Sequence, residues 1–538
     1  MALLLTDIKV PIQVGDEALP AMIAGQFHIP TESVRAVRLV RQSLDARKKQ
    51  DIHFLVSALV TLDSSAEGKL LKRGDARIKP YEAPSDYVLI QGEERPHGRI
   101  VVAGLGPAGL FAAYFLAREG YRPLVLERGR EIEKRREDVR RFWTGAEIDP
   151  NSNVMFGEGG AGTFSDGKLT TRIKDARAAV ALETLKKFGA PEDIVYQAKP
   201  HIGTDLLRRV VKNIREEIIA LGGEVRFEAM LEDIRLQDGE LRAVSVRQGD
   251  KFERSIECAA LILATGQAAR DTYEMLLSKG LTLQPKSFAV GVRIEHPQDL
   301  IDRVQFGALA GHPRLGAAEY RLAGKSGARG VYTFCMCPGG YVVGAASGAG
   351  EVVVNGMSDR ARDGANANAA VIVQVGPEDF GKDALDGVRF QRELEQKAYA
   401  EGFKTGAYFA PAQRLEDFMR GNATKSFGDV KPSYKPGVHP ARLDAVLPPY
   451  IATGIRDGIA AFSRQLAGYH LPDAVLTAVE SRTSSPVRIL RDLNGEAEGA
   501  RGLFPVGEGA GYAGGIVSAA VDGMHAAERV ASRYKALQ

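Results

Sequence analysis

Three closely spaced glycines carry the strongest chemical signal in this sequence. They form the pattern Gly104-x-Gly106-x-x-Gly109, which follows the apolar segment 100–103 and precedes a helical pattern over 110–119. In a strand–turn–helix unit, such glycines permit a tight turn, a close approach of the backbone to a pyrophosphate, and close packing of helix on strand. The free N–H groups at the start of the helix then point at the phosphates. The spacing predicts a dinucleotide-binding unit.

An acidic residue stands where the ribose of such a ligand is expected. Glu127, followed by Arg128, ends the next apolar segment at about the 20-residue separation typical of this unit. A carboxylate there accepts hydrogen bonds from ribose hydroxyls and disfavours a 2′-phosphate. The expected ligand is therefore FAD or NAD rather than NADP.

The composition is that of an ordinary globular protein. The chain has 538 residues, of which 44% are hydrophobic and 26% charged, and its net charge is +3. This length predicts two or three domains, and the small net charge argues against a nucleic-acid partner. Three cysteines, no signal peptide and no apolar run of membrane-spanning length predict a cytoplasmic protein without a membrane contact.

The patterns divide the chain into four parts. Residues 1–95 are expected to form a small α+β module and residues 99–270 the first part of the dinucleotide-binding domain. Residues 271–479 are expected to form a substrate or cap domain, and residues 480–538 return to the dinucleotide-binding domain.

The N-terminal module carries a local basic patch. The favoured interpretation is a solvated face and hairpin tip; the alternative is docking of RNA or an acidic partner, although Phe54 is the only nearby aromatic residue for base stacking. The patch consists of Arg35, Arg38, Arg41, Arg47, Lys48 and Lys49.

Three later segments extend this pattern. A strand meander is expected over 224–257, then a separate buried strand ending in Ala264-Thr265-Gly266, and a late motif runs over 506–511. Together with the glycine fingerprint and Glu127, this order resembles the glutathione-reductase-type FAD fold. The resemblance implies that Glu508 bonds the ribityl chain or the pyrophosphate side of FAD. It also implies that the last helix starts beneath the flavin, where its N–H groups stabilise negative charge at N1 and O2.

Four longer segments resemble signatures of a bacterial family of uncharacterised FAD-dependent dehydrogenases. They are 156–168, 334–340, 480–488 and 507–516, so the resemblance covers nearly the whole chain. It implies FAD and a two-domain flavoprotein core but no particular substrate. The expected fold class is α/β: a Rossmann-like FAD-binding domain of glutathione-reductase type, an inserted α+β cap domain and a small N-terminal α+β module.

The loop 156–168 is expected to be the second phosphate-side loop, since glycines allow close approach and N–H and hydroxyl groups bond pyrophosphate oxygens. An ordinary glycine-rich turn is the alternative. The Cys-x4-Cys pair of disulfide reductases is absent from this region, which argues against their mechanism. The predicted cofactor contacts are Gly104, Gly106, Pro107, Ala108, Gly109, Glu127, Arg128, Gly160, Gly162, Thr163, Ala264, Thr265, Gly266, Gly507, Glu508, Gly515 and Ile516.

Three side chains are candidates for redox or charge-stabilising chemistry. Lys168 ends the glycine loop and would stabilise a reduced, anionic flavin; a surface pair with Asp166 is the alternative. On a strand, Cys335 and Cys337 would share one face at about 6.6 Å between Cα atoms, within disulfide range. They are interpreted as a redox dithiol or a nucleophile, or else as two buried thiols in a core strand. Without a further Cys or His cluster, no metal site is expected.

The loop 481–488 holds two guanidinium groups just before the last FAD motif. Arg482 would bind a substrate carboxylate or phosphate bidentately, whereas a structural role is expected for Arg488. The alternative for the loop is a hinge of the cap domain stabilised by side-chain to backbone bonds.

These features predict an FAD-dependent oxidoreductase that transfers hydride between flavin N5 and a small organic substrate. A second glycine fingerprint is absent, so the electron donor is expected to be a transiently bound NAD(P)H, another protein, or the substrate itself. Two alternatives stay open: an RNA-modifying flavoprotein that docks RNA on residues 1–95, and a non-catalytic FAD-binding redox sensor that uses Cys335 and Cys337 as its switch.

Overall fold

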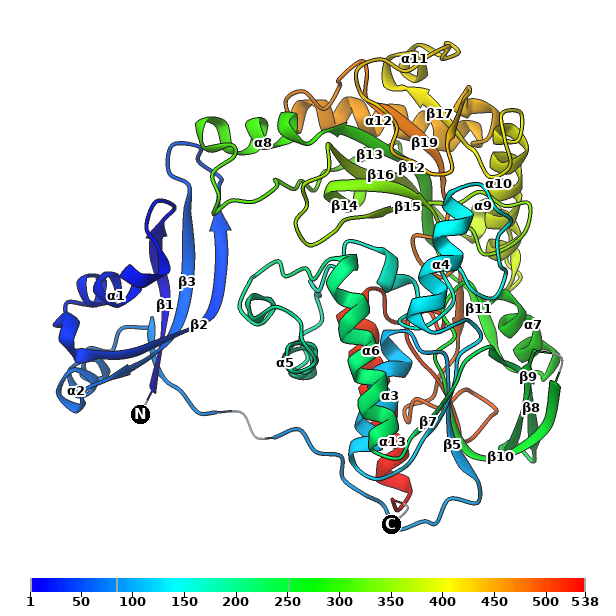
Figure 1. Cartoon of the computed structure of the whole chain (residues 1–538), viewed down its shortest axis with the longest axis horizontal. Helices are drawn as coiled ribbons and strands as arrows, with labels where there is room; N and C mark the ends of the chain where they lie inside the picture. The colour runs from blue at the N-terminus through cyan, green and yellow to red at the C-terminus, as the bar shows by residue number, and fades with distance from the viewer. Residues whose placement is uncertain (1, 84–85, 250, 537–538) are drawn as a thin grey trace.

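Two large sheets form the main body of the molecule, and a smaller N-terminal sheet stands to one side (Figure 1). The computed structural model describes residues 2–83, 86–249 and 251–536. None of the helices in these ranges is long and apolar enough to cross a membrane. Short 3-10 helices lie at Asp16–Ala18, Thr31–Ser33, Ala161–Phe164, Glu192–Val195, Gly307–Leu309 and Leu443–Ala445.

The N-terminal sheet has the strand order β2-β3-β1-β4. Phe54, Val56, Ala58 and Val60 lie at alternate positions of β3 and are buried in the core that the sheet forms with the two helices of the module. Asp63 caps the second helix, since its carboxylate accepts a hydrogen bond from Ala66 N at 2.8 Å. The elements are β1 (Ala2–Pro11), α1 (Leu19–Phe27), β2 (Val34–Asp45), β3 (His53–Leu62), α2 (Ser64–Lys72) and β4 (Ile78–Pro80).

The seven-stranded sheet combines a parallel part with an antiparallel meander. Its order is β7-β6-β5-β10-β9-β8, with β21 pairing β10 on the parallel side. The expected boundary between meander and buried strand is wrong: β10 is one long strand, antiparallel to β9 at its start and parallel to β5 at its end. The strands are β5 (Arg99–Ala103), β6 (Leu124–Leu126), β7 (Glu224–Arg226), β8 (Ala229–Gln237), β9 (Glu240–Gln248), β10 (Lys251–Leu263) and β21 (Leu503–Pro505).

Helices cover the parallel part of this sheet, and two of them touch backbone to backbone. A Cβ added to Gly109 would lie 1.9 Å from Gly104 O, and one added to Gly523 would lie 2.0 Å from Ala108 O. Only glycine permits these approaches. The first packs the start of α3 onto its own turn, and the second brings α13 against α3. The helices are α3 (Pro107–Arg118), α4 (Ile132–Trp143), α5 (Arg177–Lys187), α6 (Thr204–Ala220), α7 (Arg270–Ser278) and α13 (Ile516–Arg533).

The eight-stranded sheet is mostly antiparallel, in the order β13-β14-β16-β12-β19-β17-β18, with β15 pairing β14. Its central strands β12 and β16 are buried on both faces, and α12 packs across β13 and β16. The strands are β12 (Phe288–Pro297), β13 (Ala323–Ser326), β14 (Arg329–Gly344), β15 (Val354–Met357), β16 (Asn366–Val375), β17 (Ala410–Arg414), β18 (Val438–Pro440) and β19 (Val475–Glu480). The helices are α8 (Gln298–Phe306), α9 (Pro377–Phe380), α10 (Asp386–Gly402), α11 (Leu415–Arg420) and α12 (Pro449–Gln465).

A two-stranded sheet lies where the chain passes between the two large sheets. It pairs β11 (Leu283–Pro285) with β20 (Val487–Ile489) in antiparallel register. The first strand follows α7, beside the seven-stranded sheet, and the second follows β19 of the eight-stranded sheet. The chain therefore crosses between the sheets at neighbouring points, which places the loops around 286 and 482–488 at the junction.

Candidate functional site

The glycine motifs meet at the carboxyl ends of three adjacent parallel strands. Leu263 of β10 is in register with Ala103 of β5 on one side and Pro505 of β21 on the other. Gly104 follows with φ +98°, and a Cβ there would lie 2.4 Å from Ala264 O. Ligands of open α/β sheets bind at this edge. The structure thus brings the predicted motifs 104–109, 264–266 and 507–515 together.

The second glycine loop lies against the starts of both α3 and α13. A Cβ on Gly160 would lie 3.0 Å from Gly106 Cα, and one on Gly162 would lie 3.2 Å from Ile516 Cγ1. Gly160 therefore lies against the first glycine motif and Gly162 against the start of α13. The Thr163 hydroxyl, in contrast, points inward: it is buried and donates to Glu158 O at 3.4 Å, so the phosphate-facing hydroxyl expected there is not what this geometry provides.

Glu127 ties three loops together through their backbone. Its Oε2 accepts a hydrogen bond from Leu105 N at 2.8 Å, and its Oε1 accepts from Gly129 N at 2.9 Å and Gly157 N at 3.0 Å. A carboxylate has about four acceptor positions. The side chain is buried and retains acceptor capacity for a ribose hydroxyl while it holds the loops in place.

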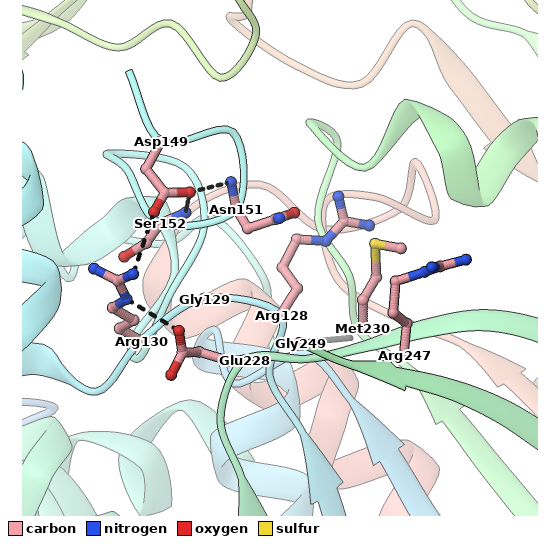
Figure 2. A pocket seen from close by; sticks show the side chains of 10 residues that line it. All are labelled: Arg128, Gly129, Arg130, Asp149, Asn151, Ser152, Glu228, Met230, Arg247 and Gly249. Carbon is pink, nitrogen blue, oxygen red and sulfur yellow. Dashed lines mark hydrogen bonds and ion pairs between the residues drawn. The ribbon is translucent and has the colours of Figure 1, made fainter. Parts of the chain in front are cut away.

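A pocket of about 210 Å³ opens beside this carboxylate, between the end of β6 and the meander (Figure 2). The Arg128 guanidinium lies 4.4 Å from the centre of the Phe156 ring and donates to Asp271 Oδ2 at 2.7 Å. The residues that line the pocket are Arg128, Gly129, Arg130, Asp149, Asn151, Ser152, Glu228, Met230, Arg247 and Gly249.

The far end of the site leaves space and an unpartnered acceptor. A Cβ added to Gly266, Gly514 or Gly515 would meet no atom within 4 Å. Gln267 Nε2 donates to Glu508 Oε1 at 2.8 Å, while the buried Gln267 Oε1 has no hydrogen-bond partner among the described residues. Burial raises the pKa of Glu508 to about 7. Open glycine backbone next to a free amide oxygen and a carboxyl group fits a bound ribityl chain and ring.

Arg135 is a site residue that the sequence analysis missed. It is fully buried, and its guanidinium donates to five backbone carbonyls of the second glycine loop at 2.6–3.2 Å. The guanidinium of this one residue therefore holds the backbone of the loop over 153–160 in place. The available signal was its place on the buried face of α4, in line with Ile132, Val139 and Phe142.

Three of the candidate catalytic residues, Lys168, Cys335 and Cys337, come together at a bulge in β14. Lys168 Nζ donates to Met336 O, next to Cys335 and Cys337. The expectation that the two thiols share one strand face is wrong, because the pairing of β14 with β16 shifts between Phe334 and Cys337 and Cys335 has φ +41°. Cys335 is exposed, whereas Cys337 is buried, donates to Cys335 O at 3.3 Å, and has a pKa raised by burial.

A buried arginine that the sequence analysis did not single out holds this bulge. Arg293 Nη1 donates to Cys335 O at 2.8 Å, and Nε donates to Glu480 Oε2 at 2.8 Å. Arg293 is fully buried, and burial raises the pKa of Glu480 against the opposing effect of the guanidinium. The signal was a charge in an apolar strand, since Arg293 stands in the sequence 288–294.

Arg482 is committed to the protein itself. Its Nε and Nη2 donate to Glu395 at 2.9 and 2.8 Å, Nη2 donates to Glu351 at 2.8 Å, and Nη1 donates to Ser347. Arg270 of α7 binds the same two glutamates. Asp166 likewise pairs with Arg362, not with Lys168. In this arrangement Arg482 has a structural ion-pair role, and the proposed substrate clamp finds no support in its contacts.

Comparisons place these features among known proteins. Residues 287–483 match the family described as FAD-dependent protein, C-terminal domain-like, and residues 3–61 match a domain of unknown function, DUF8436. An uncharacterised protein of Clostridium beijerinckii is 46% identical over 538 residues, which is 99% of each chain.

Two solved structures resemble the chain at low identity. One is a triple mutant of the flavin-dependent brominase Bmp2, with 12% identity, coverage of 81% and 80% of the two chains, and a TM-score of 0.37. The other is a geranylgeranyl bacteriochlorophyll reductase-like protein from Thermoplasma acidophilum, with 14% identity, 81% and 78% coverage, and a TM-score of 0.35. The glutathione-reductase subclass of the fold stays a prediction.

The family match agrees with the glycine motifs and with the fit of the site, and the predicted cofactor is confirmed. With 46% identity over nearly the whole of both chains, the protein belongs to the family of the Clostridium beijerinckii protein, and it carries the C-terminal domain of FAD-dependent proteins, with FAD as its cofactor.

Proposed function

We propose that the protein is an FAD-dependent oxidoreductase that transfers hydride between the flavin and a small organic substrate. The observation that carries this proposal is the meeting of the FAD loops with the cap at one place. Lys168 of the second glycine loop bonds the β14 bulge, and Gln267, after β10, donates to Arg482 O at 3.0 Å. Domain junctions of this kind are common places for substrate pockets.

Each part of the cofactor has a set of residues to hold it. Glu127 and the adjoining 210 Å³ pocket suit the adenosine, and the N–H groups that open α3, with Gly160 and Gly162, suit the diphosphate. Glu508 and Gln267 suit the ribityl chain. The start of α13 at Gly515 and Ile516 places a helix N-terminus at the flavin end of the site.

When bound, FAD supplies two-electron redox chemistry, and the protein supplies orientation and charge. Among the described residues, no carboxylate lies within ion-pair distance of Lys168, whose recorded partner is the carbonyl of Met336. A cation already held in place needs no reorganisation when negative charge develops nearby. Lys168 is therefore the residue that we assign to charge stabilisation, while Arg293 and Glu480 hold the bulge that presents Cys335.

A direct test is anaerobic reduction of the purified holoenzyme, followed by flavin absorbance. NADH, NADPH and a metabolite panel are supplied in turn, and the expected result is bleaching of the flavin bands by at least one of them. Protein that shows no flavin absorbance even after FAD is supplied would contradict the proposal. We further propose that the substrate is a small molecule, that the donor binds transiently, and that the protein works in the cytoplasm.

A further inference from the structure

The two arginines of the loop 481–488 differ in how their charge is compensated. Arg482 contacts Glu351 and Glu395, as described above. Arg488, on β20, has no ion pair within the described ranges, and its Nε is buried without a hydrogen-bond partner. Its guanidinium lies 5.2 Å from the ring centre of Tyr512, which is 40% exposed. The structure therefore reverses the expected roles: Arg482 is structural and Arg488 is the one with unused donors.

A second cation without an ion-pair partner among the described residues, Lys286, lies near Arg488. Lys286 follows β11, and its backbone N donates to Pro486 O at 2.8 Å, so it joins the same two-stranded sheet. Its Nζ reaches only Ser485 O, at 3.5 Å, and no described carboxylate forms an ion pair with it. Burial lowers the pKa of Lys286, and the neighbouring Arg488 lowers it further, while Glu508 acts in the opposite direction.

Both cations lie at the flavin end of the FAD site. A Cβ on Gly511 would lie 2.9 Å from Arg488 Cα, and one on Gly509 would lie 2.6 Å from Gly266 O. Glu508, directly before Gly509, is close enough to Lys286 to raise the pKa of that lysine, while Lys286 lowers the pKa of Glu508. The diphosphate end, at Gly106 and Gly160, is a different part of the site. An anion held by Lys286 and Arg488 would therefore belong to a group other than the diphosphate.

Partly buried cations without a counterion are unfavourable, because they lose hydration and gain no ionic partner. A ligand that brings a carboxylate or phosphate reverses this deficit. Arginine binds such groups with two parallel N–H donors, and lysine adds a point charge. The Tyr512 ring lies beside the Arg488 guanidinium, and the buried Nε has no hydrogen-bond partner among the described residues, so the side chain has donor capacity that the protein does not use.

We propose that Lys286 and Arg488 bind the anionic group, a carboxylate or a phosphate, of the substrate. This inference rests on the proposed function, because it places the anion at the flavin end of the same site. It also names the substrate class: a small anionic molecule that docks its charged group against the β11–β20 sheet.

The test is isothermal titration of the FAD-loaded protein with two probes, oxalate for a carboxylate and inorganic phosphate for a phosphate. We expect one of them to bind the unmodified protein. Arg488→Gln and Lys286→Gln should each raise its Kd at least tenfold and change the Kd of FAD less than twofold. Arg303→Gln is the matched control, because Arg303 is exposed on α8 and pairs with Asp299 there.

Three results would overturn the inference. They are failure of both probes to bind, equal binding by the Gln variants, and a tenfold loss of FAD affinity in those variants, which would assign the cations to the cofactor. Failure of the unmodified protein to bind FAD is a different result that overturns the proposed function. In that case the anions are titrated into the protein without FAD, and the first two results still decide this inference.

Discussion

The two sides of the site are formed by different kinds of groups: backbone on one side and buried side-chain ion pairs on the other. The parallel sheet contributes backbone: glycines, helix starts and one carboxylate, Glu127, that bonds three N–H groups. The eight-stranded sheet and the segments around it contribute buried side-chain pairs, such as Arg293 with Glu480 and Arg482 with Glu395. A backbone site depends on local spacing, whereas a side-chain network depends on which distant segments meet. The difference predicts that substitutions on the two sides fail in different ways.

The largest effect is expected at the buried ion pairs beside the eight-stranded sheet. Arg482→Gln leaves the buried Glu395 with only Arg270 as a full charge partner, and the free energy of unfolding should fall by about 3 kcal/mol. Urea unfolding measures this change. Arg389→Gln, on the exposed face of α10, should change stability by less than about 0.5 kcal/mol. Equal stability of the two variants would show that the ion-pair cluster does not hold the junction.

The same cluster has a pH signature. Burial alone would raise the pKa of Glu395, but Arg482 and Arg270 hold it below its ordinary value of 4.5. A group with a lowered folded-state pKa stabilises the protein in full above its unfolded value, and the contribution is lost as the pH falls through the lowered value. The stability difference between the native protein and Arg482→Gln should therefore shrink as the pH falls below about 4.5.

An intermediate effect is expected on the backbone side, where it should appear in cofactor affinity. Arg135→Lys replaces the guanidinium that holds five carbonyls with an ammonium that has three donors, so the second glycine loop loses its support. The Kd of FAD should rise about tenfold, or about 1.4 kcal/mol, measured by flavin fluorescence quenching. Arg136→Lys, one position along and exposed, is the control. An unchanged FAD affinity in Arg135→Lys would show that FAD binding does not depend on the support that Arg135 gives to the loop.

The smallest effect concerns the β14 bulge. Because Cys335 is exposed while Cys258 and Cys337 are buried, a thiol reagent should modify Cys335 before the other two cysteines of the native protein. Desolvation raises the pKa of the Cys335 thiol to about 12, so this first phase should speed up as the pH rises. Cys335→Ser should remove that first phase and change stability by less than about 0.5 kcal/mol. Loss of two thiols per chain in the first phase would show that Cys337 is also accessible, and it would favour the redox-sensor alternative.

The parts of the site that sequence could predict are those encoded within a few residues. The fingerprint, Glu127 and the late motif were identified because strand, turn and helix follow one another directly. The bulge at Cys335 was not predicted, because the strand pattern gives no sign of a register shift that depends on β16. The partners of Arg135 and Arg293 could not be predicted either, since burial of a charge is decided by segments elsewhere in the chain.

The strand β21 belongs to the seven-stranded sheet and the helix α13 packs beside it, and their late position in the chain has a consequence for biosynthesis. The strand Leu503–Pro505 and the helix Ile516–Arg533 complete a layer that begins at Arg99. Gly92 N donates a hydrogen bond to Ala531 O of this helix, and Lys535 N, just after the helix, donates to Glu94 O. A ribosome-bound chain that still lacks these residues has only half of the cofactor cradle. Flavin loading must therefore await synthesis of these residues, and deletion of Ile516–Arg533 should yield a colourless product.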